Sequence, residues 1–321
     1  MSDDETRSSA DLPLEPILLP ESPFASPGGP LAPPRRRPRV WTVFAVFVLS
    51  QVLGLLAAAL FLAALTISTR AAGVHPPEHA DADMSIVVGG AAGFLGMLLS
   101  TMIVFLVLAI AAAVLSPVPW RKRLRLRAAR VSPLAVVVSL CGILAISLAL
   151  EALDALGALP QSPVLEMLAD LVATLSGPTL WAAVFVIGVA PGIAEEVLFR
   201  GYIQTRLSKR WGPGWAILVT SLLFGLNHWD LVQGTFAVAI GIYLGYLTER
   251  TGTIWPAMLC HATNNVIATL TAAGDVDVVA MLGTVTTLVV AIVVVSFSAW
   301  YLRTFLGATE NADSGEGAAE K

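Results

Sequence analysis

Long apolar stretches dominate this sequence, and their spacing predicts a bundle of membrane-spanning helices. A helix needs about 20 mostly apolar residues to cross a bilayer. Apolar stretches of that order lie at roughly 41–67, 86–116, 133–152, 180–205, 213–228, 232–248, 253–273 and 278–302. We therefore expect an all-α polytopic membrane protein with about eight transmembrane helices.

The composition supports this class and excludes others. Hydrophobic residues make up 56% of the chain and charged residues 13%, whereas soluble domains average about 45–50% and about 25%. A cytosolic enzyme and a nucleic-acid-binding protein are therefore excluded. Residues 1–39 are rich in proline and residues 306–321 are polar, so we expect two disordered tails around a transmembrane domain at 40–305.

Basic residues gather on one side of the predicted bundle. Arg35–Arg39, the segment 121–130 and Lys209 fall on that side, whereas Arg70 stands alone on the other. The positive-inside rule then predicts that both termini are cytoplasmic and that the amphipathic stretch 164–175 lies at the outer surface. The preference for arginine over lysine and the abundance of alanine favour a GC-rich bacterial genome, and so the bacterial plasma membrane.

Three charged residues interrupt the fourth apolar stretch. Glu195, Glu196 and Arg200 lie well inside it, where insertion costs about 2.5–3.5 kcal/mol per charge near the bilayer centre. Glu196 and Arg200 are four residues apart, so they share a helix face and can form an ion pair. Glu195 is rotated by about 100° from Glu196, which leaves it free to face a cavity. The alternative is that these residues form a purely structural ion-pair cluster. The sequence favours that alternative less for Glu195 than for Glu196 and Arg200.

Two later helices each carry a histidine that is four residues from another motif residue. Phe224 and His228 share one face, and His261 and Asn265 share another, with Asn264 offset from them. A membrane histidine on its own is more often a packing residue than a catalyst. Phe224 is expected to pack, and Asn264 to form an interhelical hydrogen bond.

The helix connections predict that these polar residues meet. The tight connection 210–215 joins two antiparallel helices, and Glu195 and His228 lie at similar distances along the chain from it. Pro191 and Pro256 should kink their helices near Glu195 and His261, which is tolerated where helices line a cavity. We therefore expect an intramembrane active-site cavity that contains a carboxylate, two imidazoles and a carboxamide.

Small residues predict where helices approach closely. Gly188 and Gly192 form one Gly-x-x-x-Gly pair, and Gly241 and Gly245 form another. Such pairs allow two helix backbones to come into contact.

The motifs Glu195-Glu196-x-x-x-Arg200, Phe224-x-x-x-His228 and His261-x-x-x-Asn265 resemble those of the CPBP intramembrane proteases. That family includes the type II CAAX prenyl endopeptidases, the bacterial abortive-infection proteins and the lysostaphin-resistance-like proteins. The resemblance covers a protease-like core at about 180–270 and also implies a plan of eight helices.

The resemblance implies a role for each motif residue. Glu195 would activate a water molecule for attack on a peptide carbonyl, and His228 would help to hold or deprotonate that water. His261 and Asn265 would stabilise the oxyanion, while the supporting residues Glu196 and Arg200 hold the site. The implied substrate is a membrane-associated peptide or protein, and prenylated CAAX proteins are one possible class.

Two alternatives remain open. The preferred mechanism is a glutamic one with no cofactor, but Glu195, His228 and His261 could instead bind zinc and leave a position open for water. The other alternative is a membrane transporter or partner-binding protein, because intramembrane Glu and His also form proton relays. The polar helices cluster in 180–270 with no counterpart in 40–150, which favours the protease over a transporter built from repeats.

Overall fold

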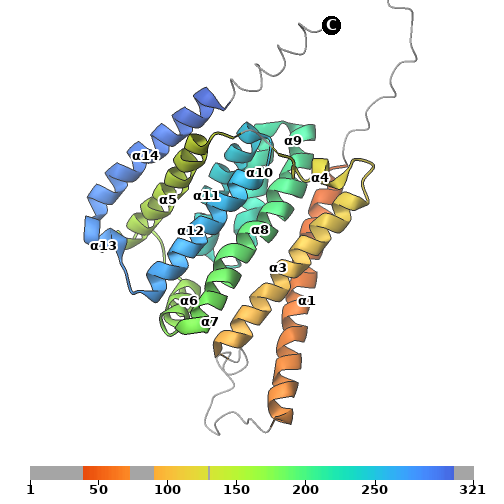
Figure 1. The fold of residues 1–321 in the computed structure, drawn as a ribbon, viewed down its shortest axis with the longest axis vertical. Helices are drawn as coiled ribbons and strands as arrows, with labels where there is room; N and C mark the ends of the chain where they lie inside the picture. The colour runs from red at the N-terminus through yellow and green to blue at the C-terminus, as the bar shows by residue number, and fades with distance from the viewer. Residues whose placement is uncertain (1–38, 73–89, 129–130, 307–321) are drawn as a thin grey trace, which may run out of the picture. The chain divides into compact units, whose positions relative to one another are not determined.

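The computed structural model describes residues 39–72, 90–128 and 131–306, and within these residues it contains α- and π-helices and no strand (Figure 1). The helices of the first half are α1 (Trp41–Ala71), α3 (Gly90–Val114), α4 (Trp120–Arg123), α5 (Pro133–Ala155), α6 (Pro163–Ala173) and α7 (Gly177–Ala183). The second half contains η1 (Val184–Val189), α8 (Ala190–Glu196), η2 (Val197–Gln204), α9 (Thr205–Trp211), α10 (Pro213–Leu226), α11 (Leu231–Thr251), α12 (Trp255–Ala273), α13 (Val278–Leu282) and α14 (Thr284–Phe305), where η denotes a π-helix. The predicted disordered tails lie outside the described residues, apart from their innermost positions.

Six helices of the described part are long and apolar enough to cross a membrane: α1, α3, α5, α11, α14 and the continuous helix from Gly177 to Trp211. The all-α polytopic membrane fold is thereby confirmed. Helix α10 has 14 residues and α12 has 19, and neither is among the six, although both occupy predicted spans. The number of eight spans stays a prediction.

The helix that carries the charged residues is built from alternating α and π segments. The two π segments, η1 and η2, lie on either side of α8, and α8 contains Pro191, Glu195 and Glu196. Directly after η2, the side-chain hydroxyl of Thr205, the first residue of α9, donates to the carbonyl of Arg200, five residues earlier, at 3.0 Å. π segments inside an α-helix are rare and occur frequently at functional sites.

The predicted role of Pro256 is corrected by the structure. Pro256 lies in the first turn of α12, which begins at Trp255. A proline at this position loses no helix hydrogen bond, because the first backbone N–H groups of a helix have no partner within it. Pro256 therefore starts the helix instead of bending it near His261.

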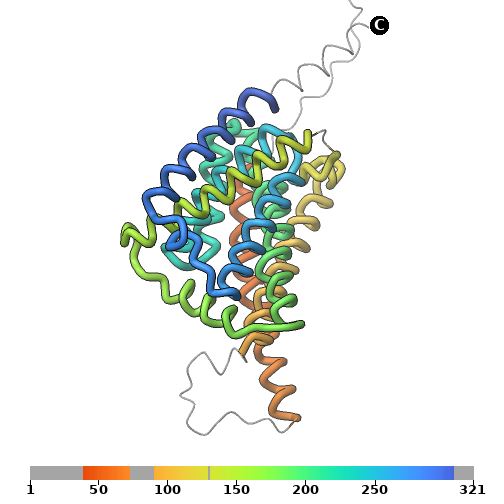
Figure 2. Tube along the Cα trace, turned by 60° about the vertical axis from the view of Figure 1, so that its left-hand side comes forward, coloured from red at the N-terminus to blue at the C-terminus, as the bar shows by residue number. Residues whose placement is uncertain are grey.

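Helix α12 lies among α5, α6, α8, α11 and η1 (Figures 1 and 2). Its contact with the charged helix has no space for side chains. A Cβ atom on Gly188 would lie 3.1 Å from the Cα atom of Val266, and one on Gly192 would lie 2.7 Å from the backbone nitrogen of Ala262. The predicted close approach at this Gly-x-x-x-Gly pair is confirmed.

The second Gly-x-x-x-Gly pair brings α11 against its neighbours. A Cβ atom on Gly241 would lie 3.1 Å from that of Ser221, and one on Gly245 would lie 2.8 Å from Oε1 of Gln204. Helices α10 and η2 can therefore pack directly on α11, which positions the end of α10 beside α8.

The outward faces of the bundle are apolar, as a lipid-facing surface requires. Leu55 of α1 is 60% exposed and Ile292 of α14 is 63% exposed. Large contiguous apolar surfaces are rare on soluble monomers. The predicted amphipathic segment 164–175 forms α6, whose first turn is capped by the hydroxyl of Ser162.

Candidate active site

The predicted pair of Glu196 and Arg200 forms the innermost part of the site. Nη1 of Arg200 donates to Oε1 of Glu196 at 2.6 Å, and both side chains are fully buried. Nη2 of Arg200 donates to the carbonyl of Gly241 in α11 at 3.2 Å. The guanidinium also lies over the ring of Phe224, 4.5 Å from its centroid. A buried charge of this kind needs a close partner, because the interior cannot solvate it.

His261 of α12 connects the two glutamates. Its Nδ1 lies 2.9 Å from Oε1 of Glu196, and its Nε2 lies 3.7 Å from Oε2 of Glu195. Because Glu196 is already bound to Arg200, it acts as an acceptor, and so Nδ1 of His261 carries the proton in this contact. The Nε2 atom is therefore turned towards Glu195. The predicted meeting of Glu195 and His261 is present in the structure.

Glu195 has a different set of neighbours from Glu196. Its side chain is 6% exposed, and Nδ2 of Asn227 donates to its Oε1 at 3.3 Å. Among the described residues, no arginine or lysine forms an ion pair with it. Its carboxylate thus faces an amide and an imidazole instead of a fixed positive charge.

Two residues that sequence reasoning missed complete this arrangement. Asn227 follows the last residue of α10, and its Oδ1 accepts a hydrogen bond from Nε2 of Gln51 in α1 at 2.9 Å. This bond fixes the orientation of the Asn227 amide, because an oxygen that accepts from Gln51 leaves the NH₂ group to face Glu195. Gln51, a polar side chain within the apolar stretch 41–67, was the available signal.

His228 lies just beyond α10, beside Phe224. Its Nδ1 lies 2.9 Å from the carbonyl of Phe224, and the two rings meet edge to face with centroids 5.1 Å apart. The Phe224 ring also contacts His261, with centroids 5.7 Å apart. Phe224 therefore packs between both histidines and Arg200, as its predicted packing role requires. In the described residues no hydrogen bond joins His228 to Glu195.

The two asparagines of α12 lie one turn further along. Oδ1 of Asn264 accepts from the hydroxyl of Ser147 in α5 at 2.6 Å, which confirms the interhelical hydrogen bond. Nδ2 of Asn265 donates to the carbonyl of Ile187 in η1 at 3.5 Å. Asn265 therefore lies at the same helix contact as His261, and its long hydrogen bond leaves the amide weakly held.

Some polar atoms at the centre of the site have no partner. Oε2 of Glu196 and Nε of Arg200 are buried and form no hydrogen bond to the described residues. An unsatisfied buried polar atom typically costs about 1–3 kcal/mol. Such atoms are few in native proteins, and a catalytic role is one of the explanations for them.

The zinc alternative was tested against the donor geometry. In the described part of the chain, no group of three or more His, Cys, Asp or Glu side chains is arranged to hold a metal ion. Nδ1 of His261 contacts Glu196 and Nδ1 of His228 contacts the carbonyl of Phe224, so Nε2 is the ring nitrogen that either histidine could offer to a metal. The described residues therefore hold no preformed set of three zinc ligands, and the zinc alternative stays a prediction.

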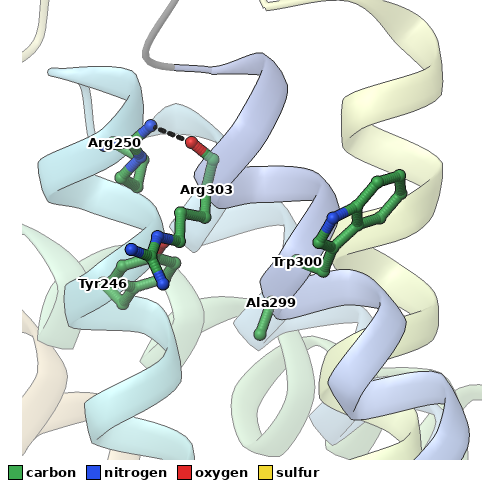
Figure 3. Close-up of a pocket in the computed structure, with 5 residues that line it drawn as sticks. All are labelled: Tyr246, Arg250, Ala299, Trp300 and Arg303. Carbon is green, nitrogen blue, oxygen red and sulfur yellow. Dashed lines mark hydrogen bonds between the residues drawn. The ribbon is translucent and has the colours of Figure 1, made fainter.

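One pocket lies away from these residues. It is lined by Tyr246, Arg250, Ala299, Trp300 and Arg303, between α11 and α14 (Figure 3). Arg250 there donates to the carbonyl of Arg303 at 2.6 Å. None of the predicted site residues is among its lining, and the cavity predicted around Glu195 stays a prediction.

Comparisons with known proteins match the same part of the chain. Residues 177–267 match the family described as Type II CAAX prenyl endopeptidase Rce1-like. The chain is also 30% identical over 82 residues to YdiL of Bacillus subtilis (strain 168), a proposed membrane peptidase. That match covers 26% of this chain and 34% of the relative, so the chain spans about a third of the relative's length. No solved structure matches. The segment 177–267 that is similar to this family contains Glu195, Glu196, Phe224, His228 and His261.

Proposed function

We propose that the protein is an intramembrane endopeptidase in which Glu195 activates a water molecule. The observation that carries this proposal is the contrast between the two adjacent glutamates. Glu196 is paired with Arg200 at 2.6 Å, whereas Glu195 receives a hydrogen bond from a neutral amide and faces Nε2 of His261 at 3.7 Å. A carboxylate without a fixed counter-charge in a water-poor site is a competent general base.

The proposed reaction needs no group beyond the peptide, water and the side chains of the site. The Glu195 carboxylate takes one proton from water, and the oxygen of that water bonds to the carbonyl carbon of the peptide. The π electrons of the carbonyl move to its oxygen, which becomes an oxyanion. The proton then passes from Glu195 to the amide nitrogen, the C–N bond breaks, and the oxyanion collapses to a carboxyl group.

His261 and Asn265 are proposed to stabilise the oxyanion. Asn265 can donate from its amide because its present bond to Ile187 is long, at 3.5 Å. His261 can donate from Nε2 when both ring nitrogens carry protons, with Nδ1 held by Glu196 at 2.9 Å. Removing one such donor typically costs about 10²–10³ in kcat. His228 is proposed to orient the water, from the end of α10.

The proposed substrate is a membrane-associated peptide or protein. Peptide hydrolysis is supported by the family match at residues 177–267 and by the relative's name. The word prenyl in the family's description makes a prenylated peptide one class to test. The lipid bilayer is the other partner, and it delivers the substrate to the buried carboxylate.

The test uses purified full-length protein in lipid nanodiscs with two probes. One is a farnesylated CAAX peptide, and the other is an unprenylated transmembrane peptide. Cleavage is followed by mass spectrometry for wild type, Glu195→Gln and the exposed control Glu166→Gln. We expect cleavage of at least one probe by wild type and the control, and none by Glu195→Gln. Equal cleavage by Glu195→Gln would contradict the proposed base.

We propose that both termini are cytoplasmic, with the bundle in the bacterial plasma membrane. The proposal is supported by the positions of two helices at opposite ends of the bundle in Figure 1: α9, which contains Lys209 and Arg210, and α6, which contains Glu166 and Asp170. Reporter fusions after Lys209 should then be active in the cytoplasm, and fusions at Glu166 should be active outside. The reverse pattern would contradict this orientation.

A further inference from the structure

Two arginines at one end of the bundle are both buried and lie close together. Arg123 of α4 is 7% exposed and Arg206 of α9 is 8% exposed. Burial, and after it the positive charge of Arg206, lowers the pKa of Arg123, so the two charges interact. Leu124, the residue after Arg123, packs on the charged helix, because a Cβ atom on Gly201 would lie 3.1 Å from its carbonyl oxygen. Helices α4 and α9 occupy the same end of the bundle in Figure 1.

Neither arginine has a carboxylate partner among the described residues. The Nε atoms of Arg123 and Arg206 are buried without a hydrogen-bond partner there. Nη1 of Arg206 donates to the hydroxyl of Thr42 at 3.2 Å, and its guanidinium lies 4.4 Å from the ring centroid of Tyr202. These contacts support the side chain but bring no negative charge. Buried charges in proteins are usually paired.

The carboxylate that contacts α9, through the hydroxyl of Ser208, is already engaged. Glu249 of α11 accepts from Arg125 at 2.9 Å and from Gln204 at 2.9 Å. The other carboxylates of the described residues lie elsewhere, either in the Glu195–Glu196 site or towards the opposite helix ends, at Glu151, Asp154, Glu166, Asp170, Asp230, Asp275 and Asp277. Lys209, which is exposed, adds a further positive charge beside Arg123 and Arg206. This end therefore has an excess of positive charge that the described side chains do not neutralise.

Membrane orientation alone does not account for this arrangement. The positive-inside rule requires basic residues beside the membrane, but it does not require that two of them be buried next to each other. Burial, and after it the charge of Arg206, lowers the pKa of Arg123. A cost of this kind is offset when an anion binds between the two guanidinium groups.

We propose that Arg123 and Arg206, with Lys209 at the rim, form a binding site for a phosphate group. A guanidinium presents paired N–H donors that match two phosphate oxygens, and basic pockets between membrane helices bind anionic lipid headgroups. An anionic phospholipid is the favoured source. Trp211 of α9 is 41% exposed and Trp120 of α4 is 36% exposed, and tryptophans beside such a site are typical of the membrane interface.

The test measures lipid binding to the purified full-length protein by native mass spectrometry and thermal unfolding. The probes are phosphatidylglycerol, phosphatidylcholine and inorganic phosphate. The variant is Arg123→Gln/Arg206→Gln, and the matched control is Arg121→Gln/Arg210→Gln. The control removes the same charge from the same two helices, but at exposed positions.

We expect wild type and the control to bind phosphatidylglycerol at least about tenfold more tightly than phosphatidylcholine, which is the ratio that one charge-assisted hydrogen bond supplies. The variant should lose this preference. In phosphatidylcholine nanodiscs it should unfold at the same or a higher temperature than wild type, because a repulsion has been removed.

Three further outcomes show whether the phosphate group belongs to a lipid and whether the site exists. If millimolar inorganic phosphate raises the unfolding temperature of wild type as much as phosphatidylglycerol does, a free phosphate is the ligand. Equal loss of phosphatidylglycerol binding in the variant and the control would show general surface charge and overturn the site. If the double variant does not fold, Lys209→Gln is compared with Arg210→Gln, and equal binding by these two also overturns it. Peptide cleavage is not used as a readout, so failure of the proposed protease function leaves this test intact.

Discussion

Gly192→Ala should separate the two helices that carry Glu195 and His261. A Cβ atom at position 192 would lie 2.7 Å from the nitrogen of Ala262 and 2.8 Å from its Cα atom, whereas ordinary contacts begin at 3.4 Å. The backbones must therefore move apart by about 0.7 Å, as the difference between 3.4 and 2.7 Å requires. No flexible side chain can absorb this displacement, because the closest atoms belong to the backbone of α12.

The displacement acts on the site through its nearest residues. His261 precedes Ala262, and its Nε2 lies 3.7 Å from Glu195. A misplacement of about 1 Å can cost about 10²-fold in rate, so we expect kcat to fall by about tenfold to a hundredfold. The same overpacking should lower the free energy of unfolding by about 1–3 kcal/mol. The loss of rate should thus exceed what partial unfolding explains.

The assay compares peptide cleavage and thermal unfolding for wild type, Gly192→Ala, a control variant and a double variant. Gly214→Ala, in α10, is the matched control, because a Cβ atom there meets nothing within 4 Å. It should keep the activity of wild type. Adding Ala262→Gly to Gly192→Ala should restore little, because the backbone atoms of residue 262 remain in place. Wild-type kcat for Gly192→Ala, or full rescue by the second substitution, would refute this reasoning.

Three further predictions follow from the site. Arg200→Ala leaves Glu196 as an unpaired buried charge, so it should lower the free energy of unfolding by about 3–5 kcal/mol, measured by denaturation. If the free energy of unfolding falls no more than it does in Glu195→Gln, this prediction is wrong. Gln51→Leu removes the hydrogen bond that orients the Asn227 amide beside Glu195, so kcat should fall while KM stays unchanged. A change in KM alone would contradict this prediction. Purified protein should keep its activity in chelator, and activity lost to chelator and restored by zinc would overturn the metal-free mechanism.

The sequence predicts those parts of the site that depend on spacing along one helix. Glu196 and Arg200 are four residues apart, and their ion pair follows directly from the helix period. The apolar stretches likewise predict the helices, because burial in lipid demands that pattern. The contact between Glu196 and His261 was not predicted. It depends on which faces α8 and α12 turn towards each other, and the spacing of residues along one helix does not give this.

Gln51 and Asn227 were missed for a related reason. Each is an isolated amide, and Gln51 lies 176 residues before its partner, so no spacing links them. Pro256 shows the opposite error, because a helix boundary shifted by two residues changes a kink into a helix start. The two π segments also lack a sequence signal, and they rotate every residue beyond them relative to a regular α-helix.

The shortness of α10 has a consequence for the supply of water, which hydrolysis consumes. Its 14 residues rise about 21 Å, against about 30 Å for the hydrocarbon core. A span that is shorter than the hydrocarbon core can be accommodated by local thinning of the bilayer. Asn227 and His228 follow its last residue, and the next residue, Trp229, is 74% exposed. On the predicted topology, in which α10 is a span, the aqueous phase would approach Glu195 from the end of α10, so membranes of different thickness should change how readily water enters the site.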